Sequence, residues 1–225
     1  MTIDDTPAPA GGGFPIWSVE NLSWRLVEVA AAGLLGGILM ILAWLGPRPD
    51  LEAALRTPVF WTKLGYAAVI AAGAGLSACR LARGRPWAPA PLIVAAVVAG
   101  GFLVFGAVQA QAMTPAALAS LSWSKALVCI ACILAIATPM LLFSSYGLAS
   151  VDPERPRLVG FAGGVACGAV ADIVFGLHCA SSTFAFIAPW HTAGMLVCGL
   201  AGLLLVSVFA RLQRARVMAV ESLGV

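Results

Sequence analysis

Six apolar runs, separated by short polar segments, dominate the hydrophobic pattern of this chain. They extend over residues 24–44, 61–79, 88–110, 125–143, 158–177 and 191–210. Each run approaches the ~20 residues that an α-helix needs to cross a hydrocarbon layer of about 30 Å. The pattern therefore predicts an all-α fold, an integral membrane bundle of six transmembrane helices with both termini on the same side.

The segments outside these runs divide the chain into three parts. Residues 1–22 are rich in Pro, Gly and Asp and lack an apolar core, so we expect a flexible cytoplasmic tail and no cleavable signal peptide. Residues 23–212 form the six-helix membrane domain, and residues 213–225 form a cytoplasmic C-terminal tail. Loops of at most about fifteen residues leave no room for a second soluble domain, which usually needs at least about 50.

Composition supports a membrane protein and narrows its partners. The 225 residues are 61% hydrophobic and 10% charged, with a mean hydropathy of +0.97. Soluble domains carry roughly 25% charged residues. The net charge of +3 is spread over helix ends, so it gives no support to direct nucleic-acid binding and leaves the lipid bilayer as the first expected partner.

The basic residues predict the orientation. A cytoplasmic N-terminus places nine of them on the cytoplasmic side: Arg25, Arg80, Arg83, Arg85, Arg155, Arg157, Arg211, Arg214 and Arg216. Four fall on the outer side: Arg48, Arg56, Lys63 and Lys125. This asymmetry obeys the positive-inside rule, so we expect both termini in the cytoplasm.

Chemically versatile residues gather between the last two apolar runs. The stretch from Leu177 to Gly194 holds both histidines of the chain, His178 and His191, together with Cys179 and Trp190. We interpret it as a short outer connection between two helices, with His191 at the start of the last helix either as a helix cap or as a metal ligand. It is the best site candidate in the sequence.

An acidic residue lies within the fifth apolar run. Gly160, Gly164, Gly168 and Gly176 recur with Asp172 every four residues, which draws one narrow stripe along a helix. Small residues at this spacing allow a second helix to approach closely. Asp172 is therefore expected to face protein or water, or to be protonated, and both a structural and a functional role remain open.

The cysteines allow several interpretations. Cys129 and Cys179 share a depth near the outer surface, which permits a disulfide, whereas a soft metal would use Cys129, Cys179, His178 and His191. Cys129 and Cys132 also match the C-x-x-C spacing of a membrane thiol oxidoreductase working with a quinone. A small proton-coupled transporter using Asp172 is a third hypothesis, although no internal repeat supports it.

Three sequence blocks carry a resemblance to a known protein family. The first block is the loop GPRPDLEAALRTPVFWTKL, Gly46 to Leu64. The second comprises Trp123, Cys129 and Pro139. The third comprises Leu177, His178, Cys179, Phe186, Trp190, His191 and Gly194. Over about Trp24 to Arg216, the chain with these blocks resembles the NrsF-type (negative regulator of sigma F) anti-sigma factors, a family of six-span bacterial inner-membrane proteins.

The resemblance implies a function as well as a fold. It implies a multi-pass protein of the bacterial inner membrane that holds an extracytoplasmic-function sigma factor inactive, with no enzymatic activity and no cofactor. It also implies that Cys129 and Cys179 sense redox or heavy-metal stress and trigger release, with His178, His191, Trp190 and Asp172 in support. Two features depart from the family pattern: Ala180-Ser181-Ser182 replaces an acidic residue after the cysteine, and only Arg25 stands where an Arg-rich element precedes the first helix.

Overall fold

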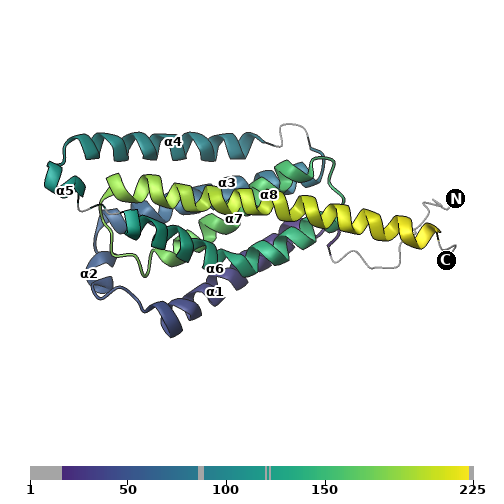
Figure 1. The fold of residues 1–225 in the computed structure, drawn as a ribbon, viewed down its shortest axis with the longest axis horizontal. Helices are drawn as coiled ribbons and strands as arrows, with labels where there is room; N and C mark the ends of the chain where they lie inside the picture. The colour runs from purple at the N-terminus through teal and green to yellow at the C-terminus, as the bar shows by residue number, and fades with distance from the viewer. Residues whose placement is uncertain (1–16, 86–88, 120, 122, 223–225) are drawn as a thin grey trace.

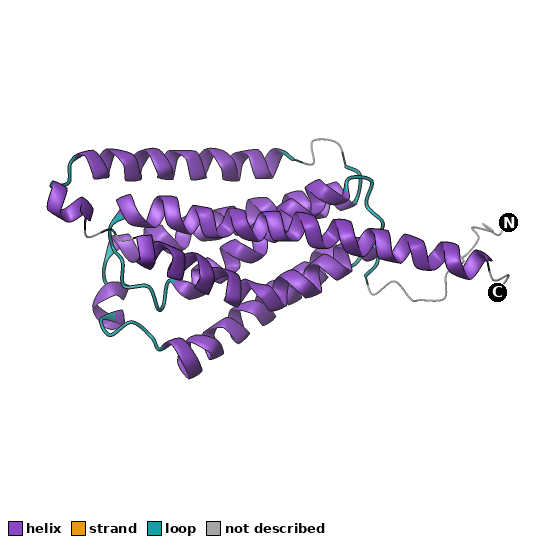
Figure 2. Cartoon of the chain, in the orientation of Figure 1, coloured by secondary structure: helices purple, strands orange, loops and turns teal. Residues whose placement is uncertain are grey.

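The computed structural model describes residues 17–85, 89–119, 121 and 123–222, and within them the chain is entirely helical and loop (Figures 1 and 2). The elements are α1 (Leu22–Met40), the π-helix η1 (Ile41–Leu45), α2 (Leu51–Leu55), α3 (Pro58–Ala82), α4 (Ala90–Gln111), α5 (Pro115–Ala119), α6 (Trp123–Ser150), α7 (Pro156–Phe175) and α8 (Phe184–Ser222). Six of these segments are long and apolar enough to cross a membrane, which confirms the predicted all-helical fold with six candidate spans.

The six long helices alternate in direction along one bundle. The start of α1 and the end of α8 lie at the same end of the molecule, as an even number of spans requires (Figure 1). The opposite end carries α2, α5 and the loop of residues 176–183, and we call it the loop end. The second half of α8 extends beyond the other helices (Figure 1).

Helix α7 is the centre of the bundle. About 78% of the residues in its most apolar 18-residue stretch are buried inside the protein. The corresponding share is 11% for α1 and for α4. It packs most extensively against α8, and also against α3 and α6. The exposed apolar faces of α1 and α4 are the surfaces that lipid tails would cover.

The glycine stripe of α7 faces α8. A Cβ atom added at Gly160 would lie 2.5 Å from the carbonyl oxygen of Gly202, and one added at Gly168 would lie 3.0 Å from the Cα of Met195. Both distances are shorter than van der Waals contact, so only glycine permits the backbones to approach this closely. The predicted close helix contact is therefore present, and α8 is the partner.

Several segments begin or end elsewhere than expected, and those near the two ends of the chain and around His191 differ most. Helix α8 starts at Phe184, so the stretch expected as an outer connection is a loop only over residues 176–183, and His191 lies inside the helix rather than capping it. The helix also continues through residue 212, where the C-terminal tail was expected to begin. Of the tail expected over residues 1–22, residues 1–16 lie outside the described part, while Trp17 is buried against Gly147 and Phe143.

The α7–α8 contact generates a stability prediction. Gly164→Ala would place a methyl group against the backbone of Cys198, so we expect the free energy of unfolding to fall by about 1–3 kcal/mol. Gly100→Ala in α4 is the matched control, because nothing lies within 4 Å of the added Cβ, and alanine favours a helix over glycine by up to about 1 kcal/mol. Reversible unfolding in detergent measures both variants, and equal effects would contradict the packing argument.

Candidate functional site

Asp172 continues the glycine stripe of α7 four residues after Gly168, and its buried side chain pairs with His191 of α8. Asp172 Oδ1 accepts a hydrogen bond of 2.5 Å from Nδ1 of His191 in α8, and both side chains are fully buried. The contact continues the register of the helix pair, because Gly168 meets Met195 one turn away on each antiparallel helix. Asp172 thus faces protein rather than lipid. This agrees with the high free-energy cost of exposing an acidic side chain to lipid tails.

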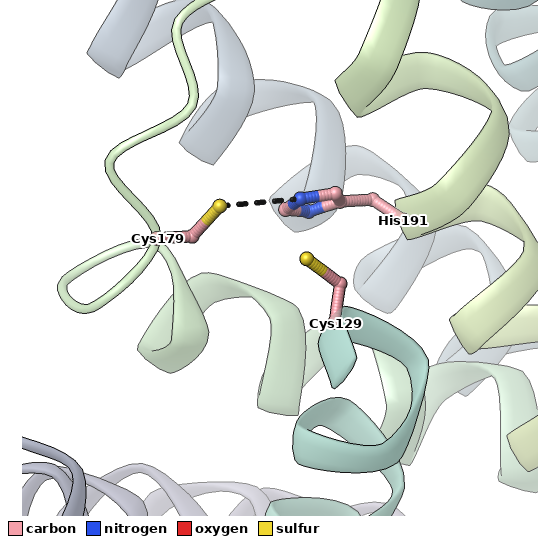
Figure 3. Close-up of side chains that lie close together, drawn as sticks. All are labelled: Cys129, Cys179 and His191. Carbon is pink, nitrogen blue, oxygen red and sulfur yellow. Dashed lines mark hydrogen bonds between the residues drawn. The ribbon is translucent and has the colours of Figure 1, made fainter. Parts of the chain in front are cut away.

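The hydrogen bond to Asp172 orients the other ring nitrogen of His191. With Nδ1–H donating to the carboxylate, Nε2 is directed at Cys179 Sγ, which lies 3.8 Å away (Figure 3). A carboxylate that holds one nitrogen of an imidazole selects its tautomer and its orientation. His191 is therefore held in position to exchange a proton with the Cys179 thiol.

Cys129 completes this group from a third element. Its sulfur, the Cys179 sulfur and a His191 ring nitrogen all lie within 4.8 Å of one another, and the three residues are buried (Figure 3). Both cysteines are free thiols. We call Cys129, Cys179 and His191 the sulfur site. It joins α6, the loop of residues 176–183 and α8, which are distant in sequence.

The sulfur site leaves out Cys132 and Cys198. Cys132 lies almost one turn further along α6, is partly exposed, and is absent from the group of potential metal-binding atoms. Cys198 is buried in α8 against Gly168 of α7. Cys179, not Cys132, is therefore the partner that the structure places beside Cys129.

The environment favours negative charge on Cys179. The hydrogen bond from the Cys129 thiol, followed by the hydrogen bond with His191 and the positive charge of Lys63, lowers the pKa of the Cys179 thiol below its usual value, although burial opposes this shift. The thiolate is the reactive form of cysteine. Cys179 thus carries a larger thiolate fraction than an ordinary cysteine at the same pH.

His178 lies apart from the sulfur site. Its Nδ1 donates a hydrogen bond of 2.7 Å to the carbonyl oxygen of Gly46, at the start of the loop that leads to α2. Gly46 has a positive φ of 77°, and its N–H closes the π-helix by donating to Ile41 O at 2.7 Å. Of the four candidate metal ligands in the sequence, the structure thus brings together three and gives His178 a role in loop packing.

Arg48 fastens the same two loops together. Its backbone N–H donates to Leu177 O at 2.9 Å, and its guanidinium donates to the carbonyl oxygens of Cys179 and Ala180 at 3.3 Å. Asp50 accepts two further bonds, at 2.8 and 2.7 Å. This pairing raises the pKa of Arg48 and lowers that of Asp50, so both stay charged around neutral pH. The first and third sequence blocks are therefore in direct contact.

Aromatic side chains pack around the residues of the sulfur site. The Trp190 ring meets Trp123 at 4.8 Å between centroids in an edge-to-face arrangement, which ties the start of α6 to α8. Phe175 lies 5.7 Å from the rings of both His178 and His191. Trp190 supports the helix contact and is not one of the sulfur-site residues.

Sequence reasoning missed two polar residues of α3. Lys63 is only 3% exposed, and within the described part of the chain its Nζ has no hydrogen-bond partner. Tyr66 shares a 2.6 Å hydrogen bond with Thr192 of α8. Lys63 was interpreted as an outer-side basic residue and as part of the first resemblance block, although its place within the apolar run of residues 61–79 is itself a signal of a buried role.

The family of the chain follows from comparison with known proteins. The family model described as "Negative regulator of sigma F" (NrsF) matches residues 17–212. The chain belongs to the NrsF family. The chain is therefore a regulator rather than an enzyme, which removes the thiol oxidoreductase hypothesis; no finding supports the transporter hypothesis.

Two curated NrsF proteins show how far the similarity extends. The anti-sigma-F factor NrsF of Caulobacter vibrioides (strain NA1000 / CB15N) is 38% identical over 183 residues, which cover 79% of this chain and 84% of the relative. The probable anti-sigma-F factor NrsF of Azospira oryzae (strain ATCC BAA-33 / DSM 13638 / PS) is 34% identical over 209 residues, covering 91% and 97%. No solved structure matches the chain.

The Asp172–His191 pair yields a test of its structural role. Asp172→Asn keeps an oxygen that accepts from His191 Nδ1, so the fold should be retained, whereas Asp172→Leu leaves that donor unpaired and should cost about 1–3 kcal/mol. Asp152→Asn breaks an exposed ion pair with Arg214 and should change stability by at most about 1 kcal/mol. Thermal unfolding in detergent compares the three variants. A leucine variant as stable as the asparagine variant would show that the pair is dispensable for the fold.

Proposed function

We propose that this protein restrains a sigma factor at the bacterial inner membrane and releases it when chemical stress modifies Cys129 and Cys179. Membership of the NrsF family and the names of its two relatives support the regulatory part. The sensing part is carried by one observation. Two free thiols from different elements lie beside an oriented imidazole.

Oxidation offers one way to change this site. A two-electron oxidant would take two electrons from the paired thiols, form an S–S bond between Cys129 and Cys179, and release two protons. The sulfurs lie within 4.8 Å, and a disulfide needs about 2.05 Å, so a small movement of α6 or of the loop suffices. Such a bond would tie α6 to the segment that joins α7 and α8.

Binding of a soft metal ion is a second way to link α6 to the loop that carries Cys179. Two thiolates and an imidazole nitrogen are the donor types that zinc and copper(I) prefer. The second nitrogen of His191 is already held by Asp172, an arrangement typical of metal-binding histidines. Metal binding would release the thiol protons and draw α6, the loop and α8 together around one atom.

Helix α8 supplies a route from the sulfur site to the other end of the protein. It begins at Phe184 beside the loop end and continues unbroken to Ser222, beyond the rest of the bundle (Figure 1). To lower the fraction of the protein in its sigma-binding state from 99% to 1%, the modification must stabilise the released state over the binding state by about 5.5 kcal/mol. One disulfide contributes typically 2–4 kcal/mol, so the released state must also gain from new packing or from a lost contact.

Cysteine variants test the sensing step. Cys129→Ser and Cys179→Ser should each keep repression, yet shift the oxidant or zinc concentration that gives half-maximal release by more than about tenfold, since one thiol cannot form the bridge. Cys198→Ser, buried elsewhere in α8, is the matched control. A sigma-dependent promoter fused to a reporter measures release. Normal induction in both variants would refute thiol sensing and leave the regulatory assignment intact.

The proposed orientation has its own test. The nine-to-four distribution of basic residues favours cytoplasmic termini, which would put the sulfur site on the outer side. Alkaline phosphatase, active only outside the cytoplasm, should be inactive when fused after Val225 and active when fused to a truncation after Met113. The opposite result would place the cysteines on the cytoplasmic side. Co-purification of a sigma factor with the membrane protein tests the partner directly.

A further inference from the structure

A cavity opens at the loop end, next to the sulfur site. It has a volume of about 160 Å³ and lies among the Arg48–Asp50 turn, α2, the start of α3 and the loop of residues 176–183. Polar side chains on its wall include Ser181 and Ser182, which follow Cys179 directly after Ala180. The cavity is therefore a short path from the loop-end surface to the residues around Cys179.

The charged groups of the cavity do not balance. Its wall includes two cations, Arg48 and Lys63, and one carboxylate, Asp50, which leaves one positive charge. Arg48 is paired with Asp50 and donates two further hydrogen bonds to loop carbonyls. Lys63 therefore supplies the excess charge, since its Nζ finds no hydrogen-bond partner in the part of the chain that the structure describes.

Lys63 links the cavity electrostatically to the sulfur site. It belongs to the cavity wall, and its charge acts on Cys129, Cys179 and His191. The side chain is 97% buried, with 3% exposed. A buried ammonium whose Nζ donates no hydrogen bond within the described residues favours an anion's oxygen atoms close to it, beyond the charge that it shares with Cys179.

We propose that this cavity binds a small anion, held by Lys63 with Ser181 and Ser182 at the approach to Cys179, and that it selects anionic over cationic thiol reagents. The proposal deepens the proposed function by naming the chemical class that reaches the sensing cysteine. A cleft of one charge sign raises the local concentration and arrival rate of ligands of the opposite sign. The hydroxyl groups of the two serines add neutral donors that suit an anion's oxygen atoms.

Charged methanethiosulfonates of similar size test the selection. The sulfur of Cys179 attacks the reagent, an S–S bond forms, methanesulfinate leaves with the electron pair, and any thiol proton passes to solvent. The rate at the Cys179 peptide is followed by mass spectrometry of the full-length protein in detergent, with the sulfonatoethyl and trimethylammonioethyl reagents. Dividing each rate by that of 2-mercaptoethanol and taking the anion-to-cation ratio cancels the intrinsic reactivity of the thiol.

The native protein should favour the anionic reagent by roughly tenfold or more. Lys63→Met should bring the ratio close to one, whereas Lys63→Arg should retain it. Arg56→Met is the matched control, because this cation is on the same surface, paired with Glu52 and outside the cavity. A ratio near one in the native protein, or a ratio unchanged by Lys63→Met, would overturn the proposal.

Sulfate provides a test that needs no variant. At matched ionic strength, sodium sulfate should slow the reaction of Cys179 with the anionic reagent more than sodium chloride does, because it occupies the cavity without reacting. Equal rates in the two salts would refute an anion site even if Lys63→Met did not fold. Promoter release plays no part in either measurement, so a failed thiol switch and a failed anion site give different results.

Discussion

The hydrogen bond between Asp172 and His191 is the interaction on which the rest of this structure depends. Two ionisable side chains lie fully buried at the contact of two membrane-spanning helices, where water cannot replace a lost partner. They reach each other only because the glycines of α7 let α8 approach to backbone contact. Close packing and polar pairing thus support one another, and the register of α7 against α8 satisfies both.

The hydrogen bond that holds His191 also determines how its ring faces the two cysteines. One nitrogen of the ring is held by Asp172, so the other is directed at Cys179, with Cys129 next to it. From the other side, His178 and Arg48 hold the loop that carries Cys179 against the Gly46–Asp50 turn. The reactive sulfur is therefore held between a rigid helix pair and a fastened loop, which suits a site whose chemical change must move helices.

Much of the fold could be read from the sequence because it depends on local properties. A run of about 20 apolar residues predicts a span whatever surrounds it, and a four-residue glycine repeat predicts a close helix contact without naming the partner. Cys129 and Cys179 could be placed at a common depth by counting residues along each helix. The pattern of apolar runs placed His191 at a helix end, because the last run begins at that residue, whereas the helix begins at Phe184.

The contacts between distant segments depend on how the helices are rotated relative to one another and on how the loops pack. The identity of α8 as the partner of the glycine stripe, the bond from His191 to Asp172, and the separation of His178 from the sulfur site all depend on which faces meet. Lys63 is the clearest case, since its charge indicated a surface position while the packing of α3 buried it beside two thiols. Sequence alone determined how many helices cross and where small or polar residues interrupt them. Only the tertiary structure decided which side chains share one buried volume, because contacts between distant segments depend on helix packing geometry that no single segment encodes.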